Sequence, residues 1–430
     1  MSDQTALNVQ STALQLEHVD EMVALYLQRD DALYGRIDEA TDAISVSTRN
    51  ARFPIQVTNG SQFSQTSADN ADMGVGGADD YEVLQLSIVF FDQAVSIAKL
   101  PEVATDSKGK AVRDYAKEQM QASLAQFRSG LESLYQSDGS GTLDTIVTAS
   151  SGSGSGAMFS NITVNNANNF QDSQIIQVFP NVGGVTRGTF QISSVDSLGK
   201  TLWSSQALPS TGGATQAGDI LVVNGASGAA GASLLGLKYY QVNSNTGSLL
   251  GLNRSSFPGK LSTPTVNLNG NAITIQALRR MVQLTRVALG DQNPAAKDII
   301  FYAGLDQQAA VENLHLQVAK TIQNEVKNSG APVDMGTKEP SDEVLGRELF
   351  VSVHASAGRI DALCLKNWGR LSTVPVSLYD VGGQNVFPRY GASGGIQTSS
   401  QWYYWTGQNL VNRNVRAGAY AQNCGLPSGY

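Results

Sequence analysis

The stretch Lys110–Gln136, KAVRDYAKEQMQASLAQFRSGLESLYQ, decides the fold, because it predicts one long amphipathic helix. Its apolar residues recur every three or four positions and therefore share one stripe of an α-helix. They are Val112, Tyr115, Ala116, Met120, Leu124, Phe127, Leu131, Leu134 and Tyr135. At 1.5 Å per residue the helix would be about 40 Å long. One small core does not need such a helix, so we expect it to cross a large domain or to act as a strut to which other parts are attached.

The segment before this helix predicts an extended acidic hairpin. Apolar residues alternate in 53–57 and again in 81–98, and a period of two indicates strands. The residues between are small and polar, beginning with an Asn59-Gly60 turn. The whole stretch 53–98 contains no Lys or Arg, and its acidic residues are Asp69, Asp72, Asp79, Asp80, Glu82 and Asp92. The hairpin is therefore either an ordinary part of a sheet or a protruding arm that reaches the basic residues of a partner.

Composition places the chain among folded, loop-rich proteins with a largely neutral polar surface. Its 430 residues are more than one core usually organises, so two or three domains or sub-domains are expected. Only 15% of the residues are charged, compared with about a quarter in a typical domain. The net charge of −8 argues against a broad basic surface that follows nucleic acid, although local contacts stay open.

The sequence indicates neither export nor membrane insertion. The N-terminal MSDQTALNVQ lacks the basic and apolar regions of a signal peptide, and no run of 18 apolar residues occurs. Cys364 and Cys424 lie far apart, and two cysteines do not make a disulfide framework. A reducing compartment therefore fits better.

The rest of the chain alternates between helical and strand-like segments. We expect an amphipathic N-terminal helix within residues 12–41. Between 174 and 250, short apolar runs separated by turns predict a small all-β barrel or sandwich. Thr274 and Gly290 mark the ends of a second amphipathic helix. The remaining predicted elements are helices at 306–328 and 358–367, and strands at 239–242, 297–304, 348–354, 368–381 and within 397–421.

No motif in the sequence carries a reaction or a metal ion. His18, His315 and His354 have no second His or Cys at ligand spacing. Nucleotide-binding, serine-hydrolase, zinc-protease and calcium-loop motifs are missing as well. Cys364 and His354 both lie in apolar or strand-like runs, and we interpret them as structural core residues. The aromatic run Trp402–Trp405 could form a sugar platform, but at strand spacing it more often packs on both faces of a sheet.

The order of these elements resembles that of the major capsid proteins of tailed bacteriophages, which have the α+β Hong Kong 97-like capsid fold. In that family an N-terminal arm precedes a hairpin called the E-loop, a long spine helix, a peripheral domain and an axial domain. Three short stretches are similar to a pattern that recurs in such proteins. They are AGDILVVNG at 217–225, GLK at 236–238 and LNRSSFPG at 252–259. The final NLVNRNVRAGAYAQNCGLPSGY looks like the family's return strand and tail. The small all-β segment is not part of the minimal fold and resembles an inserted domain.

The resemblance implies a division of the chain into six parts. They are an N-terminal arm with an amphipathic helix (1–50), the E-loop hairpin (51–100), a peripheral domain with spine helix 110–136 (101–173), an inserted β-barrel or sandwich (174–255), helix 275–289 with the axial domain (256–395), and a return strand with the C-terminal tail (396–430).

The resemblance also implies a structural role, without a cofactor or catalysis. The chain would assemble into hexamers and pentamers of an icosahedral head around double-stranded DNA, in the host bacterial cytoplasm, and would be found in the virion capsid. Its partners would be further copies of itself, a portal, a scaffold and a decoration protein, with no membrane involved. An acidic protein fits this role, because the genome must move in and out without being gripped tightly.

The hairpin departs from the family in one informative way. Some relatives join subunits through an isopeptide bond from an E-loop lysine to a neighbour's asparagine, but this hairpin has no lysine between Phe53 and Ala98. We therefore predict non-covalent locking, in which the acidic hairpin lies across basic residues of a neighbouring spine helix. Each exposed pair contributes about 0–1 kcal/mol, so several must act together. The candidate contact residues are Asp69, Asp72, Asp79, Asp80 and Glu82 on the hairpin, and Lys108, Lys110, Arg113, Lys117 and Arg128 on the spine.

Two other functions stay open from the sequence alone. A tail-tube or fibre component would also self-assemble, and it would use the β segment and the aromatic run without needing the long helix. A carbohydrate-acting enzyme would combine the aromatic run with an acidic pair, although no paired-carboxylate motif supports one. The shape of the purified protein separates the three functions, as closed shells, tubes or dispersed molecules.

Overall fold

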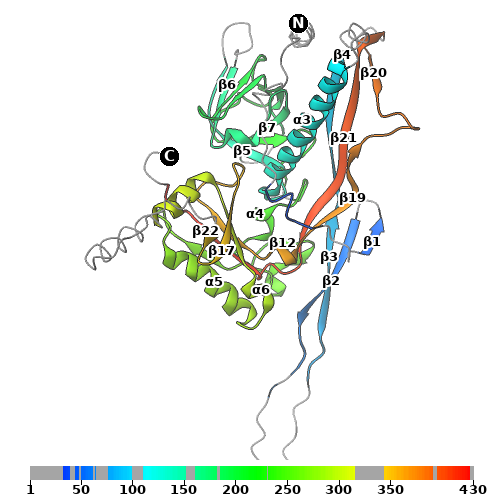
Figure 1. Ribbon diagram of the computed structural model, residues 1–430. Coiled ribbons are helices and arrows are strands. Elements are labelled where there is room, and N and C mark those ends of the chain that lie inside the picture. Colours follow the sequence, from blue (N-terminus) through cyan, green and yellow to red (C-terminus); the bar gives the residue numbers. More distant parts are fainter. Residues whose placement is uncertain are drawn as a thin grey trace, which may run out of the picture.

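The structure is a computed structural model that describes residues 32–38, 44–47, 50–61, 63, 76–98, 110–151, 160–181, 185–229, 231–314, 343–390 and 395–426. The chain has an α+β fold. A long helix runs beside one sheet, a hairpin projects from the body, and two further sheets form an axial domain and a small β module (Figure 1).

The long helix α3 spans Lys110–Tyr135, which confirms the helix predicted over 110–136. Its second half is buried, with Phe127 and Leu131 packed against two strands of the neighbouring sheet. The helix therefore acts as a spine along that sheet, as the sequence predicts, because its apolar stripe and the sheet bury each other's surfaces.

The sheet beside α3 is organised around one strand of 17 residues, β21 (Ile396–Asn412). β4 (Val89–Ala98) pairs with one edge of β21, and β19 (Trp368–Leu378) and β20 (Phe387–Tyr390) pair with the other. We call this the peripheral sheet. The sequence-based division placed residues 368–395 in the axial domain, but their strands pair in the peripheral sheet.

The predicted hairpin consists of β2 (Asn50–Thr58) and β3 (Asp80–Ser87), with the short β1 (Ile44–Ser47) along the outer edge of β2. The alternating run 81–98 is two strands and not one, because the chain leaves the hairpin at Ile88 and then pairs with β21 as β4. Alternation continues through Ile88 since both strands are extended, and a local pattern does not reveal a change of partner.

The axial domain contains a six-stranded sheet in the order β14-β22-β18-β15-β17-β16. Helix α5 (Ile275–Leu289) covers one of its faces. The Thr274 hydroxyl caps α5 by accepting from the Ala277 amide, and Gly290 ends it with φ 89°, which confirms both predicted boundaries. The strands of this sheet are β14 (Thr265–Asn267), β15 (Ile300–Ala303), β16 (Glu343–Val344), β17 (Arg347–Val351), β18 (Ile360–Leu363) and β22 (Gly418–Gln422).

Two predicted elements are wrong. The helix predicted at 358–367 is β18 followed by the 3-10 turn η4 (Leu365–Asn367), because a continuous apolar run of this length is ambiguous between a helix and a fully buried strand. The first half of the strand predicted at 239–242 belongs to a short helix, α4 (Leu237–Tyr240), and the second half has no regular structure. The helix predicted at 306–328 is helical over 305–314, and the remainder lies outside the described residues.

Of the predicted N-terminal helix, only residues 32–38 are described, and these form turns. The remaining short elements lie between the β module and α5 or beside it. They are β12 (Ser248–Leu249), β13 (Leu252–Asn253), η3 (Arg254–Ser256) and α6 (Pro294–Lys297).

Residues 142–223, which we call the β module, form a seven-stranded sheet in the order β8-β7-β11-β5-β6-β10-β9. The strands at the two ends, β8 and β9, follow each other in the chain and are separated only by Ile192 and Ser193. The sheet therefore bends around on itself into a small barrel. The strands are β5 (Thr142–Ser151), β6 (Ser160–Val164), β7 (Ile175–Phe179), β8 (Gly188–Gln191), β9 (Ser194–Asp196), β10 (Thr201–Ser204) and β11 (Ile220–Val223). The short 3-10 turn η2 (Ala167–Asn169) joins β6 to β7.

The β module begins at Thr142, before the start at 174 that the sequence suggests. The reason lies in β5, whose register shifts between Ile146 and Thr148, so that its inward residues do not alternate regularly. Its many Thr and Ser residues resemble a linker. The interior of the module is apolar and buried, formed by Ile146, Ile162, Val164, Ile176, Val178, Phe190, Ile192, Leu202 and Leu221.

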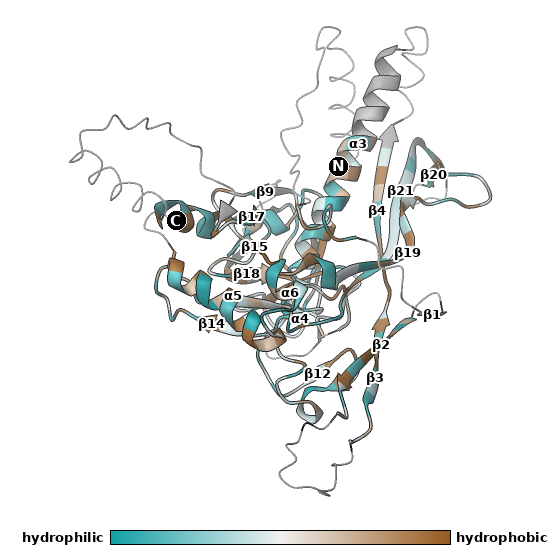
Figure 2. Ribbon diagram, turned by 60° about the horizontal axis from the view of Figure 1, so that its bottom comes forward, coloured by the Kyte–Doolittle hydropathy of each residue, from teal (hydrophilic) through white to brown (hydrophobic). Residues whose placement is uncertain are grey.

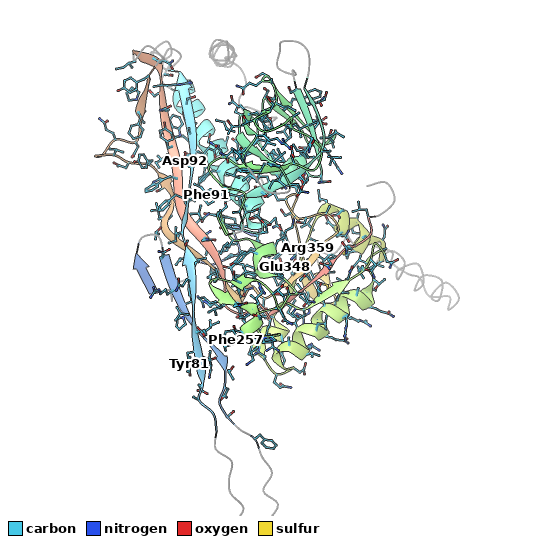
Figure 3. The ribbon with its side chains drawn as sticks, turned by 180° about the vertical axis from the view of Figure 1, so that it is seen from behind. Tyr81, Phe91, Asp92, Phe257, Glu348 and Arg359 are labelled. Atoms are coloured by element: carbon cyan, nitrogen blue, oxygen red, sulfur yellow. The ribbon has the colours of Figure 1, made fainter. Side chains whose placement is uncertain are left out.

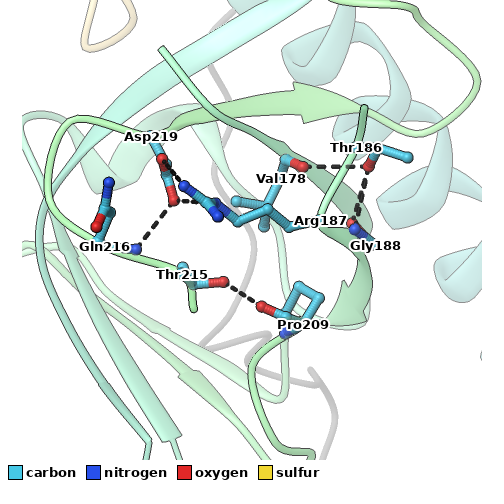
Figure 4. A network of polar contacts seen from close by, with 8 residues as sticks. All are labelled: Val178, Thr186, Arg187, Gly188, Pro209, Thr215, Gln216 and Asp219. Atoms are coloured by element: carbon cyan, nitrogen blue, oxygen red, sulfur yellow. Dashed lines mark hydrogen bonds and ion pairs between the residues drawn. The ribbon is translucent and has the colours of Figure 1, made fainter. Parts of the chain in front are cut away.

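One buried ion pair lies in the β module (Figure 4). Arg187 Nε and Nη2 donate to the two carboxylate oxygens of Asp219 at 2.6 and 3.0 Å, and both side chains are more than nine-tenths buried. Asp219 also accepts from the backbone amide of Gln216. The pair thereby fixes the loop that leads into β11, and its two-pronged geometry offsets part of the cost of burying both charges.

Candidate assembly interface

The described acidic residues of the hairpin lie at its outer end. Asp79 is exposed and accepts from the Gly60 amide across the hairpin at 2.8 Å, which closes the described end of the two strands. Asp80 is exposed and Glu82 half-buried, and neither forms an ion pair within the described part of the chain. Asp69 and Asp72 lie outside the described residues. The outer hairpin therefore presents carboxylates that form no ion pair with the described part of their own subunit.

Apolar groups are exposed between these carboxylates. Tyr81 is 64% and Val83 43% exposed, on the face of β3 opposite to the buried Leu84 and Leu86. Figure 3 shows Tyr81 near the outer part of the hairpin, away from the body. A strand that mixes exposed acidic and aromatic residues is suited to a partner with both charge and apolar surface.

The hairpin is held along its length by polar contacts from three distant parts of the chain. The Asn409 side-chain amide donates to Ser87 O at the base at 2.7 Å, and the Gln85 amide donates to Leu250 O at 3.0 Å. At the outer end of β2, the ammonium of Lys260 donates to the Val57 carbonyl and the Thr58 hydroxyl at 3.0 and 2.8 Å. These contacts direct the two strands away from the peripheral sheet (Figure 1).

The predicted spine contacts lie at the other end of the molecule. α3 begins at Lys110 at the end opposite to the hairpin, and all three ribbon views agree on this separation (Figures 1 to 3). Lys108 lies outside the described residues, as do the side chains of Lys110, Arg113 and Lys117. The hairpin and the start of the spine of one subunit are therefore not brought together within that subunit.

Arg128, the fifth spine candidate, is engaged within its own subunit. Its guanidinium lies 6.0 Å from the centre of the Tyr34 ring, and its side chain is only partly exposed. To meet a neighbouring hairpin it would have to leave this ring.

The aromatic run Trp402–Trp405 packs on both faces of the peripheral sheet, as the sequence predicts. Trp402 and Tyr404 face α3, where they are buried with Phe127 and Leu131. Trp405 faces the other side, 5.3 Å from Tyr379 and 6.2 Å from Phe90. We call this second side the outer aromatic face, and it is formed by Phe90, Tyr379, Phe387, Tyr403 and Trp405.

The outer aromatic face leaves large apolar groups in contact with solvent. Phe90 is 42% and Tyr379 39% exposed. Sequence reasoning missed this face as a candidate site, because its members come from β4, β20, β21 and the residue after β19, and they meet only through sheet pairing. The one available signal was the shared strand face of Tyr403 and Trp405.

Residues 32–38 connect the spine to both domains. The carboxylate of Glu132 on α3, which is fully buried, accepts from the backbone amides of Leu33 and Tyr34 at 3.1 and 2.7 Å. Arg36 lies over the Phe350 ring of β17 and pairs with Glu348, while the amide of Arg370 on β19 donates to Asp38 O. The end of the N-terminal arm thus fastens the spine, the axial sheet and the peripheral sheet to one another.

Of the histidines and cysteines, His354, Cys364 and Cys424 are described, and all three are buried, whereas His18 and His315 lie outside the described residues. His354 is buried, with one ring nitrogen 2.9 Å from the Ser129 hydroxyl and the other 3.2 Å from the Asn169 side-chain oxygen, as expected for a structural histidine. Cys364 and Cys424 are buried free thiols, and burial raises the pKa of the Cys424 thiol to about 11. Within the described ranges, no three His, Cys, Asp or Glu side chains are grouped so that they could hold a metal ion.

None of the helices in the described part of the chain combines the length and the apolar character that crossing a membrane requires.

Comparison with known proteins identifies the fold. No protein-family model and no curated protein match the sequence. Among solved structures, a chain of the cyanophage A-1(L) capsid asymmetric unit matches over 97% of this chain and 99% of its own, with a TM-score of 0.53 and 12% identity. The capsid of a native GTA particle (95% and 96% covered, TM-score 0.45, 9% identity) and an encapsulin complex from Synechococcus elongatus (98% and 97% covered, TM-score 0.43, 11% identity) are more distant.

The match to the cyanophage capsid spans nearly the whole of both chains. Together with the spine helix, the projecting hairpin and the two sheets, it shows that this chain has the Hong Kong 97-like capsid fold, as the sequence predicts.

Proposed function

We propose that this protein is the major capsid protein of a tailed phage, a structural protein and not an enzyme, whose copies close into an icosahedral shell of hexamers and pentamers around double-stranded DNA. The observation that carries the proposal is the projecting hairpin. Its carboxylates, Tyr81 and Val83 lie exposed, although Lys260, Leu250 and Asn409 fasten the strands that carry them to the body. Such a surface is costly for a monomer and is explained if a neighbouring copy covers it.

The acidic hairpin then locks neighbouring copies without a covalent bond. Its carboxylates would meet Lys108, Lys110, Arg113 and Lys117 near the start of a neighbour's spine, which lies beside the peripheral sheet. Tyr81 and Val83 would pack on apolar surface of the same neighbour. Arg128 would join only after leaving its own Tyr34 ring. A portal, a scaffold and a decoration protein complete the proposed set of partners, and the assembled location is the virion, built in the host bacterial cytoplasm.

Negative-stain microscopy of the purified protein tests the shell. We expect closed shells, which dissociate to single chains in hot SDS, because the hairpin has no lysine for a covalent bond. Tubes would instead identify a tail component, and a ladder of covalent multimers would refute non-covalent locking. Dispersed molecules under all conditions would overturn the capsid proposal itself.

Charge reversal tests the role of the hairpin. Replacing Asp79, Asp80 and Glu82 by Lys should abolish or strongly reduce shell formation while the far-ultraviolet circular dichroism of the subunit stays unchanged. The matched control replaces Asp138, Asp196 and Glu312 by Lys, which changes the net charge equally but away from the hairpin. An equal loss of shells in both variants would show that net charge, and not hairpin docking, controls assembly.

A further inference from the structure

A second region of the chain has the opposite charge pattern to the hairpin. The stretch Ile220–Gly290 contains no Asp and no Glu. Its charged residues are all basic: Lys238, Arg254, Lys260, Arg279, Arg280 and Arg286. In a chain of net charge −8, this makes 220–290 a local source of positive potential.

Half of these cations lie on the exposed side of α5. Its other side, with Leu278, Met281 and Val282, is buried against the axial sheet, and this fixes the orientation of the helix. Arg279 and Arg286 lie seven residues apart, so they share one line along the helix at a separation of about 10 Å, and Arg280 stands beside them. Figure 2 shows α5 along the rim of the axial domain, with hydrophilic residues on the ribbon.

These arginines are only weakly engaged within the subunit. Arg286 lies 3.5 Å from Asp291, but both side chains are largely exposed, at 44% and 64%. An exposed pair of this kind contributes about 0–1 kcal/mol and exchanges readily for another anion. Arg279 and Arg280 form no ion pair in the described part of the chain.

Further cations adjoin the C-terminal end of α5. Leu289, three residues after Arg286, borders a pocket of about 330 Å³ that is also lined by Ile55 and Val57 of β2. Lys260, Arg413 and Arg416 line the same pocket, and no carboxylate does. Asn412 and Asn414 fix the loop that carries the two arginines, because their side-chain oxygens accept from the amides of residues 414 and 416. The positive surface therefore continues beyond the helix.

The chemistry of this surface favours phosphate over an acidic protein strand. An acidic hairpin like this chain's own carries Tyr81 and Val83 between its carboxylates, and a docking surface would have to cover them. The exposed side of α5 offers Val287 as its only large exposed apolar side chain. Arginine forms two-pronged hydrogen bonds with phosphate and is only weakly hydrated, so a row of arginines without apolar surroundings suits a nucleic-acid backbone.

We infer that the arginine face of α5 (Arg279, Arg280 and Arg286) binds the phosphate backbone of double-stranded DNA without sequence preference, and that it faces the interior of the shell. This inference rests on the proposed capsid function and names the surface that meets the packaged genome. Three contacts per subunit keep each attachment weak, so that many copies hold the DNA in place while single contacts exchange freely.

Salt dependence gives the inference a quantitative test. Each phosphate that is neutralised on duplex DNA contributes about 0.9 to the slope of log K against log salt concentration. Replacing Arg279, Arg280 and Arg286 by Gln should therefore reduce that slope by about 2.7. The measurement is fluorescence anisotropy of a labelled short duplex titrated with unassembled subunits at several salt concentrations, with a second duplex of unrelated sequence expected to bind equally.

The matched control replaces Arg52, Lys200 and Lys366 by Gln, which removes the same net charge from exposed positions elsewhere. We expect its slope to stay close to that of the unaltered protein. Equal losses in both variants, or no binding by the unaltered subunits at low salt, would overturn the inference. So would an arginine variant that binds DNA normally but no longer forms shells, because α5 would then be a contact between copies.

Closed shells test whether the arginine face of α5 points into the shell. DNA added to preassembled shells should not bind, whereas the same DNA should bind unassembled subunits. Binding to the outside of closed shells would overturn the interior placement. Shell formation is scored separately by microscopy, so a failure of DNA binding is distinguishable from a failure of the capsid proposal.

Discussion

The β module and the hairpin are both built from antiparallel strands. The module closes around its own interior, whereas the hairpin has one face open to solvent. The strands of the module curve around their own apolar interior and enclose the Arg187–Asp219 pair. In the hairpin, Phe53, Leu84 and Leu86 are covered near the base, while Tyr81 on the other face is exposed. The module is thus stabilised from inside, whereas we propose that the outer hairpin gains its contacts from another molecule. Substitutions in the module should change folding, and those in the outer hairpin should change association.

The largest expected effect comes from the buried ion pair of the module. Asp219→Ala leaves the Arg187 guanidinium buried without its carboxylate, which should cost about 3–5 kcal/mol of unfolding free energy. Hydrogen exchange of the module's amides measures this locally, which is required because a protein of several domains need not unfold in one step. The control is Glu348→Ala, which breaks the exposed pair with Arg36 and should cost about 0–1 kcal/mol. An equal loss of unfolding free energy in both variants would show that the buried pair is no more important for stability than the exposed pair.

The two faces of β3 provide the next test. Leu84→Ala creates a cavity at a site that is 1% exposed and should destabilise the hairpin base by about 2–5 kcal/mol. Val83→Ala, one residue away on the opposite face, should change the unfolding free energy by less than about 0.5 kcal/mol. Urea denaturation of the unassembled subunits provides both numbers. A large effect of Val83→Ala would mean that the second face of the hairpin is covered within the subunit.

A smaller effect is expected where the hairpin is fastened to the body. Lys260→Met removes the hydrogen bonds to Val57 O and the Thr58 hydroxyl but keeps most of the side-chain volume. Because the ammonium is exposed, we expect a cost of about 1 kcal/mol, seen as about fivefold faster hydrogen exchange in the hairpin strands. Lys200→Met, on an exposed turn of the β module, should leave that exchange unchanged. Unaltered hairpin exchange in the Lys260 variant would show that the backbone contacts alone direct the hairpin.

The smallest effect on folding should accompany a clear effect on assembly. Tyr81→Ala removes a side chain that is 64% exposed and should change subunit stability by less than about 0.5 kcal/mol. Shell yield, counted by microscopy, should nevertheless fall, because the neighbouring copy loses its aromatic contact. Leu198→Ala, at a module position that is 97% exposed, is the control and should leave the yield unchanged. A normal yield with Tyr81→Ala would remove the aromatic residue from the proposed interface.

Patterns of neighbouring residues predicted the elements that are determined by interactions between residues close together in the sequence. The helical period of Lys110–Gln136 and the caps of α5 at Thr274 and Gly290 are set by residues within a few positions of each other, and both helices are confirmed. The family resemblance added the overall order of the parts. β18 was misassigned because a short, fully buried strand has no alternation to recognise.

What the sequence could not reveal depends on pairing across long distances. β4 pairs with β21 about three hundred residues later in the chain, and only this pairing brings Phe90 to Trp405 in the outer aromatic face. The start of the β module at Thr142 was hidden by a shift of register in β5. The arginine face of α5 was readable as a helix with Arg on its polar side, but its exposure and the neighbouring pocket required the fold.

The late position of β21 has a consequence for synthesis. β4, β19 and β20 all pair with this strand, and β22 then completes the axial sheet, so both sheets wait for the last part of the chain. At bacterial rates of translation, β21 leaves the ribosome roughly 15–60 s after β4. Until then the outer aromatic face does not exist. A nascent chain therefore carries its hairpin before its own peripheral and axial sheets are complete.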